Sequence, residues 1–87
     1  MIRAIALEVG GDGIRINNVS PGFIMTPMTE GIPQPMIDAI AAHSALKRNG
    51  EPADVGDVAV WLTTDAARFV TGQSILVDGG YNIAGLR

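Results

Sequence analysis

The spacing of apolar residues predicts a helix at the start of the chain. Within residues 1–9 the apolar positions recur at intervals of three and four, which places them on one helical face: Ile2, Ile5, Ala6 and Val9. Gly10-Gly11 is expected to end this helix, because glycine adopts left-handed backbone angles at little cost. No Ser, Thr, Asp or Asn precedes the first apolar residue to cap the helix. We therefore expect a helix that begins in mid-course, in a chain that is a piece of a longer protein.

Two later segments have the pattern of short strands. Residues 14–20 are rich in β-branched side chains without strict alternation, as in a strand with both faces covered. Pro21 and Gly22 should end this strand, because proline cannot donate to a sheet ladder. Residues 73–77 are predicted to form the second strand, before a turn rich in glycine.

Between these strands the spacing is helical again. Helices are predicted over residues 34–43 and from Pro52 to about Thr64, with one more turn at residues 65–67. A proline-rich loop over residues 23–35 precedes them. The order strand, helices, strand is a crossover connection, so the two strands should be parallel. Two parallel strands are not a stable sheet alone, which suggests an α/β fold that is incomplete as a domain.

Composition supports the same expectation. The chain has 87 residues, of which 47 % are apolar and a further 11 are glycine. A small chain cannot cover so much apolar material by itself. We therefore expect a missing neighbour, either an N-terminal part of the same chain or other subunits.

Charge and residue types exclude several classes of function. The net charge of −3 and the scattered Lys and Arg residues argue against nucleic-acid binding. With no Cys and a single His, a thiolate or multi-histidine metal site is excluded. No apolar run approaches the ~20 residues of a membrane span, and the first residues lack the apolar region of a signal peptide. A cytoplasmic protein without metal, membrane or nucleic-acid partners is expected.

The loop from Pro21 to Thr26 is the strongest candidate for a binding site. It follows the carboxyl end of a predicted parallel strand, where ligands bind in open α/β sheets. Its backbone N–H groups and the Thr26 hydroxyl could meet a carboxamide or a phosphate. The alternative is an ordinary strand-ending turn, and residue chemistry alone favours this second interpretation.

Other candidate groups have simpler interpretations. His43 and Ser44 are expected to be exposed neighbours rather than a base and a nucleophile. Asp54 and Asp57 are expected to lie at the solvated start of a helix, where they complement its dipole. Trp61 is expected in the core or at an interface.

Three segments, taken together, point to a known family. They are Gly13-Ile14-Arg15-Ile16-Asn17-Asn18-Val19-Ser20-Pro21-Gly22-Phe23-Ile24 with Thr26, then Gly50-Glu51-Pro52 before a helix, and then Val70-Thr71-Gly72-Gln73 leading into Val77-Asp78-Gly79-Gly80-Tyr81. In this order and at these distances they resemble the C-terminal third of a classical short-chain dehydrogenase/reductase. The resemblance spans nearly the whole chain. It implies that residues 1–87 are the C-terminal segment of one Rossmann-like, doubly wound domain, with its last two parallel strands and their crossover helices.

The resemblance also implies roles for individual residues. It implies NAD or NADP as cofactor, a small-molecule alcohol or carbonyl compound as substrate, and a homo-oligomer, either a tetramer or a dimer. Ile24 would hold the nicotinamide carboxamide through its backbone, and Thr26 would add a hydroxyl contact, while Pro21 and Gly22 shape the turn. Residues from about 27 to 49 would form the substrate lid. Four apolar side chains in the lid or just before it would line the substrate pocket: Met25, Met28, Ile32 and Met36.

Departures from the family pattern limit this expectation. The glycine-rich phosphate loop, the catalytic Ser and the Tyr-x-x-x-Lys pair of the family do not occur in these residues, and position 85, four after Tyr81, is Gly. In a full-length member they precede the position of Met1. Lys47 and Asn49 stand where many members have Gly and an apolar residue. The chain alone is therefore expected to have no catalytic residue and no dehydrogenase activity. The alternatives are a non-catalytic remnant that oligomerises or binds a nucleotide weakly, and an unrelated α/β binding protein, which antiparallel or unpaired strands would favour.

Overall fold

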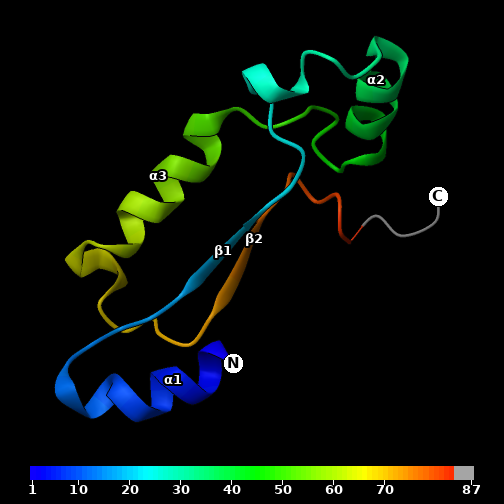
Figure 1. Ribbon diagram of the computed structural model, residues 1–87. Helices are drawn as coiled ribbons and strands as arrows, with labels where there is room; N and C mark the ends of the chain where they lie inside the picture. Colours follow the sequence, from blue (N-terminus) through cyan, green and yellow to red (C-terminus); the bar gives the residue numbers. More distant parts are fainter. Residues whose placement is uncertain (84–87) are drawn as a thin grey trace.

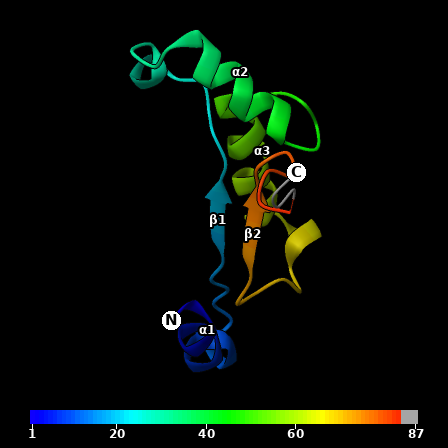
Figure 2. The ribbon, with the colours of Figure 1, turned by 90° about the vertical axis from the view of Figure 1, so that its right-hand side faces the viewer.

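The fold is built on two strands and three helices, seen in a computed structural model that describes residues 1–83 (Figure 1). The strands lie side by side, α3 runs along one face of them, α1 lies beyond one end and α2 beyond the other (Figure 2). The helices and strands are α1 (Ile2–Val9), β1 (Asn18–Pro21), α2 (Gln34–His43), α3 (Pro52–Leu62) and β2 (Ser74–Val77). Short 3₁₀ turns occur at Gly10–Asp12, Pro27–Thr29 and Asp65–Ala67.

The first helix forms where it was predicted and ends at Val9, with Gly10 as its C-cap, which confirms the predicted end. The expected left-handed angles are not found at Gly10, which keeps φ −59° and ψ −38°, and the chain continues into a 3₁₀ turn. The left-handed residue is Gly13, with φ 77°, at the end of that turn. Ala6 is buried where the helix packs near Gly72.

The two strands are parallel, as predicted, with Asn18 beside Ser74 and Pro21 beside Val77. The first strand is shorter than the predicted 14–20 and includes Pro21. In this register the alternate residues donate to β2, among them Asn18 to Gln73 O at 2.8 Å and Gly22 to Val77 O at 3.1 Å. The nitrogen of Pro21 faces away from β2, so the missing N–H costs no ladder bond.

Residues 14–17 lie outside the strand because side chains hold them instead. The Arg15 guanidinium donates to Leu62 O at 2.7 Å and to Val70 O at 3.1 Å. The Asn17 amide also donates to Val70 O, at 3.0 Å. These bonds fix the segment against the end of α3 and the turn after it, where Gly72 N–H also donates to Ile16 O at 2.8 Å. Arg15 thereby supplies positive charge at the C-terminal end of a helix, which the helix dipole favours.

The helices between the strands match their predictions within two residues. Pro35 lies in the first turn of α2, as expected, because its missing N–H needs no partner there. The last helix, α3, ends at Leu62 rather than Thr64. The hydroxyls of Thr63 and Thr64 donate to Val60 O and Trp61 O, each at 2.7 Å, which satisfies carbonyls at the helix end. The predicted extra turn is the 3₁₀ turn Asp65–Ala67.

The core of the described residues is small. The buried apolar residues are Ala6, Ile37, Leu62 and Ala67. Trp61 is 43 % exposed, so it does not lie in the core of residues 1–83, and the other predicted place, an interface, stays a prediction. The radius of gyration is 15.7 Å, whereas a compact domain of this length has about 12 Å. The open shape leaves apolar side chains uncovered, as the composition indicated. None of the helices in residues 1–83 has the length and hydropathy of a membrane span.

Candidate functional site

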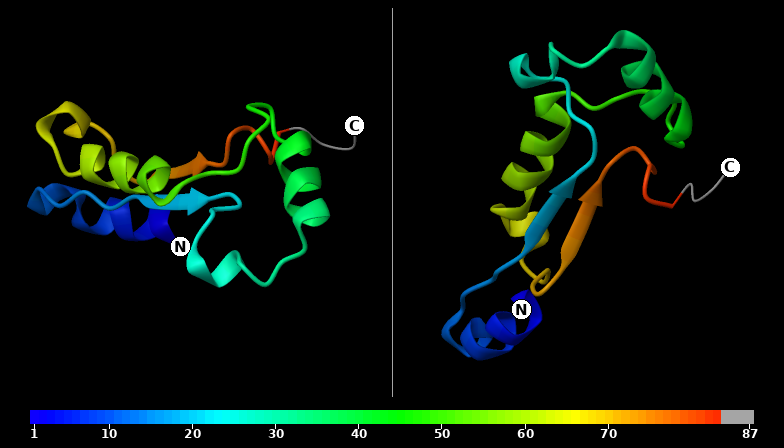
Figure 3. Two further views of the ribbon diagram at one scale, coloured as in Figure 1. Left: turned by 90° about the horizontal axis from the view of Figure 1, so that it is seen from above. Right: turned by 45° about the vertical axis from the view of Figure 1, so that its right-hand side comes forward.

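The loop from Pro21 to Thr26 leaves the carboxyl end of β1 and leads into the 3₁₀ turn Pro27–Thr29, from which the chain continues to α2 (Figure 3). We call it the cofactor loop, after the role that the family resemblance implies for it. At its start, Gly22 lies against the residue that follows β2. A Cβ atom on Gly22 would stand 2.8 Å from Asp78 Cβ and 2.9 Å from Asp78 Cα. Only glycine allows this approach, so Gly22 fixes the spacing between the loop and the C-terminal turn.

The middle of the cofactor loop is held by a single parallel bridge between Ile24 and Gly50. Gly50 N–H donates to Phe23 O at 2.9 Å, and Met25 N–H donates to Gly50 O at 2.8 Å. The bridge therefore fixes the peptide groups on both sides of Ile24. It joins the loop to the connection between α2 and α3.

This bridge leaves the peptide groups of Ile24 itself facing the other way. In a parallel ladder, the N–H and C=O of one residue point to one side and those of its neighbours point to the opposite side. Within residues 1–83, neither Ile24 N–H nor Ile24 C=O has a hydrogen-bond partner. Together they present one donor and one acceptor, the complement of a primary carboxamide.

Thr26 lies two residues further on, where the chain enters the 3₁₀ turn Pro27–Thr29. Thr26 N–H donates to Thr29 Oγ1 at 3.2 Å, and Thr29 Oγ1–H donates to Thr26 O at 2.8 Å. The Thr26 hydroxyl faces the N–H groups of this turn as in a capping box. A hydroxyl has one proton and two lone pairs, so this arrangement leaves it able to contact a ligand as well.

The four methionine and isoleucine residues predicted to line the substrate pocket differ widely in exposure. Met28 is 93 % exposed and Met36 is 55 % exposed, whereas Met25 and Ile32 are half-buried. They are spread along the segment that runs from the cofactor loop to α2. None of the four lines the cavity described next.

A cavity of about 180 Å³ lies beside the cofactor loop, whose residues Gly22 and Phe23 are part of its lining. Its lining includes Gly50 and Asn49, Leu46 near the end of α2, and Tyr81 of the C-terminal turn. It thus adjoins the side of the loop that the bridge already uses. Ile24 is itself one of the residues that line this cavity.

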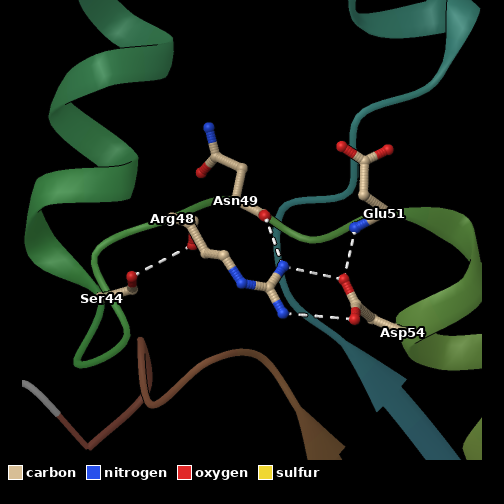
Figure 4. Close-up of polar contacts among 5 residues, drawn as sticks. All are labelled: Ser44, Arg48, Asn49, Glu51 and Asp54. Carbon is tan, nitrogen blue, oxygen red and sulfur yellow. Dashed lines mark hydrogen bonds and ion pairs between the residues drawn. The ribbon is translucent and has the colours of Figure 1, made fainter.

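A polar cluster that sequence reasoning missed surrounds Gly50 (Figure 4). The Arg48 guanidinium donates to the Asp54 carboxylate, from Nη1 at 2.9 Å and from Nη2 at 3.3 Å. The same carboxylate accepts Glu51 N–H at 2.7 Å and so caps the start of α3. The Arg48 guanidinium and then the Glu51 N–H lower the pKa of Asp54 from 3.8 to about 2. The only indication of this pair in the sequence is the opposite charge of Arg48 and Asp54. They are six residues apart, which is too far for neighbouring side chains on one helix.

Asp54 therefore has a second role besides the predicted one at the solvated start of a helix. It does lie in the first turn of α3, as expected, but it is also the partner of Arg48. Asp57, one turn further along α3, is exposed.

The prediction that His43 and Ser44 are both exposed was wrong. Ser44 is 2 % exposed, and its hydroxyl bonds to Ala41 O at 2.9 Å and Arg48 O at 3.2 Å. His43 is half-buried and meets the Tyr81 ring edge-on, with 4.8 Å between ring centroids. Each residue is thus accounted for by packing at the end of α2, and the pair does not form a base and a nucleophile.

Known proteins resemble the chain over nearly all of its length. A family model described as enoyl-(acyl carrier protein) reductase matches residues 1–82. The meso-2,3-butanediol dehydrogenase of Serratia marcescens is 46 % identical over 80 residues, which are 92 % of this chain and 32 % of that enzyme. The chain therefore spans about a third of the length of such relatives.

Solved structures agree. A 3-oxoacyl-[acyl-carrier protein] reductase from Brucella melitensis superposes with a TM-score of 0.88 at 41 % identity, over 92 % of this chain and 30 % of its own. A 4-hydroxyisoleucine dehydrogenase solved as a complex with NADH superposes with a TM-score of 0.87 at 33 % identity, over 94 % of this chain and 35 % of its own. The two parallel strands with their helices are thus part of a Rossmann-like α/β fold, which confirms the predicted fold class.

Proposed function

The chain belongs to the short-chain dehydrogenase/reductase family, and we propose that it forms the nicotinamide-side wall of an NAD(P)-dependent oxidoreductase. In this proposal the reaction interconverts an alcohol and a carbonyl compound. The cofactor is NAD or NADP, and a cytoplasmic homo-oligomer is the working assembly. Residues 1–87 are the C-terminal segment of one domain, in which residues 27–49 form the lid.

One observation carries the proposal: Ile24 has a donor and an acceptor that are held in place and have no partner within residues 1–83. A nicotinamide carboxamide has a carbonyl oxygen that accepts and an amino group that donates. Ile24 N–H would donate to that oxygen, and Ile24 C=O would accept from the amino group. The Thr26 hydroxyl would make a further contact nearby, and Gly22 would keep the loop close to the C-terminal turn.

The chemistry divides between cofactor and protein. When bound, the nicotinamide supplies the site that gives or receives a hydride. The residues of this chain bind and orient it, because a fixed carboxamide fixes the plane of the ring. Among residues 1–87, Tyr81 is the only Tyr, and no Tyr-x-x-x-Lys pair is present. We therefore expect no hydride transfer by the 87 residues alone.

A chimaera tests this proposal. In it, residues 1–82 replace the matching third of the Serratia marcescens butanediol dehydrogenase, which then supplies the remainder of the domain. We expect the chimaera to bind NADH and to oxidise the diol, with the substrate range altered because the lid is exchanged. Ile24→Pro removes the N–H and should raise the KM for the cofactor about tenfold or more. This is the effect expected when one hydrogen bond between uncharged groups is lost in a buried site. Ile24→Val, which keeps both peptide groups, is the matched control and should leave the KM within about twofold.

The outcomes separate the candidate functions. If the chimaera folds but neither binds NADH nor turns over substrate, the proposal is wrong and a remnant that only oligomerises is favoured. If it binds NADH without turnover, a weak nucleotide-binding remnant is favoured. Equal KM values for the proline and valine variants would remove Ile24 from the site.

A further inference from the structure

We propose that Arg48 is a positioning residue that holds Ile24 in place through Asp54 and Gly50, and so couples the lid to the cofactor loop. The inference rests on the proposed function, because it assigns a purpose to the orientation of the Ile24 peptide groups. The Arg48 clamp is defined here as the Arg48 guanidinium, the Asp54 carboxylate and the Glu51 N–H (Figure 4).

The clamp fixes the chain on both sides of Gly50. Before Gly50, the Arg48 guanidinium donates to Asn49 O at 3.2 Å as well as to Asp54. After Gly50, Glu51 N–H donates to the same carboxylate at 2.7 Å. Because Glu51 is tied to the Asp54 carboxylate directly and Asn49 is tied to it through the Arg48 guanidinium, the Gly50 peptide groups have little freedom to move. These are the groups that form the bridge to the cofactor loop.

The segment is also anchored to the lid. Ser44 Oγ–H donates to Arg48 O at 3.2 Å, and the Asn49 amide donates to Ile37 O of α2 at 3.1 Å. Residues 48–51 therefore contact both α2 and α3. A displacement of α2 would be carried through Asn49 to Gly50 and from there to Ile24.

The position of the ion pair argues against a purely stabilising role. The Arg48 side chain is 54 % exposed and that of Asp54 is 35 % exposed. Ion pairs this exposed contribute little to the free energy of unfolding, since water and salt screen them. Their bidentate geometry, however, fixes direction as well as distance. The contact is therefore suited to orienting a neighbouring backbone segment rather than to holding the fold together.

Amide hydrogen exchange of the chimaera tests the inference without any added cofactor. Arg48→Ala should accelerate the exchange of Gly50 N–H and Met25 N–H about fivefold or more, as for the loss of a helix cap or a charge-assisted hydrogen bond. The N–H groups of Asn18 and Gly22, which bond to β2, should change by less than about twofold. Arg48→Lys keeps the charge without the two-point contact, so it should accelerate the exchange of Gly50 N–H and Met25 N–H by less than Arg48→Ala does. Arg68→Ala removes an equally local arginine bond, to Asp65 O at 2.8 Å, and should change none of the four amides.

Two results would overturn the inference. Equal acceleration of all four amides would mean that Arg48 acts on stability as a whole. No acceleration of Gly50 and Met25 would mean that the bridge does not depend on the clamp.

The chimaera adds a second readout that keeps the two proposals apart. There, Arg48→Ala should raise the KM for NADH about fivefold while the KM for the carbonyl substrate changes by less than about twofold, because only the cofactor contact is disturbed. An unchanged KM for NADH would overturn the coupling to the cofactor, even if the unsubstituted chimaera binds NADH and so supports the proposed function. Conversely, the proposed function is rejected if the unsubstituted chimaera does not bind NADH. In that case the exchange rates of the Gly50 and Met25 N–H groups, compared with those of Asn18 and Gly22, still decide whether Arg48 positions Ile24.

Discussion

A methyl group at Gly22 is the smallest change that should disturb the cofactor loop. The added Cβ would lie 2.8 Å from Asp78 Cβ and 2.9 Å from Asp78 Cα, closer than non-bonded carbon atoms approach. Gly22 cannot move away without losing its N–H bond to Val77 O. Asp78 is equally constrained, because its carboxylate accepts Gly80 N–H at 2.9 Å and Asn82 N–H at 3.0 Å. One of these contacts must open to admit the methyl group.

The expected cost of Gly22→Ala is about 1–3 kcal/mol in the free energy of unfolding, as for other overpacked sites with fixed backbone. Gly56→Ala provides a matched control on α3. There a Cβ would meet nothing within 4 Å, and alanine in a helix should stabilise by about 0.5–1 kcal/mol. The same residue change therefore has opposite signs at the two positions.

Urea unfolding followed by circular dichroism measures both variants, with the midpoint compared at constant slope. In the chimaera, Gly22→Ala should also raise the KM for NADH, whereas Gly56→Ala should not. The reasoning is refuted if Gly22→Ala stays within about 0.5 kcal/mol of the unsubstituted chain, the range of a neutral surface change. It is also refuted if both variants shift stability in the same direction.

Three further predictions concern the lid and the clamp. Lys47 has φ 60°, so Lys47→Gly should stabilise the chain by about 0.5–1 kcal/mol despite the loss of the hydrogen bond from Lys47 Nζ to Ala42 O. A thermal midpoint of Lys47→Gly below that of Lys47→Ala would contradict this prediction. Ser44→Ala should destabilise by about 1–2 kcal/mol in urea unfolding, because buried carbonyls lose their donor, whereas the exposed Ser74→Ala should change little. The depressed pKa of Asp54, about 2 against 3.8, contributes stability above pH 4 that is lost as the pH falls through 2, and this contribution is small because the pair is exposed. Asp54→Asn should therefore flatten the decline in stability between pH 4 and pH 2 slightly, and a steeper decline in this variant would contradict the assignment.

Local sequence patterns were sufficient for the helices and for the parallel pairing of the strands. Apolar spacing and proline placed α2 and α3 within two residues, because capping and burial of one face are local effects. The strand boundary failed because Arg15 reaches carbonyl oxygens of Leu62 and Val70, which lie far along the chain. No property of residues 14–17 by themselves reveals those acceptors.

The candidate site shows the same division. The carboxyl end of β1 could be predicted as a binding position from strand order and the Pro-Gly turn. The bridge from Ile24 to Gly50 could not, since it depends on how residues 44–51 fold back toward the cofactor loop. The Arg48 clamp and the burial of Ser44 follow from that same fold-back. From the sequence alone, Ser44 is predicted to be exposed and Asp54 to be solvated, because their partners are set by tertiary structure.

The long separation between the two strands has a consequence for the order of folding. Asn17 and Gln73, at the start of the paired region, are joined by a hydrogen bond across 56 residues. Closing a loop of that length costs about 3.5 kcal/mol in chain entropy before any ladder bond forms. The helices, whose contacts are local, can form earlier. During synthesis the ladder cannot close until β2 has left the ribosome, so the cofactor loop acquires its place against Asp78 only after residues 74–78 have been made.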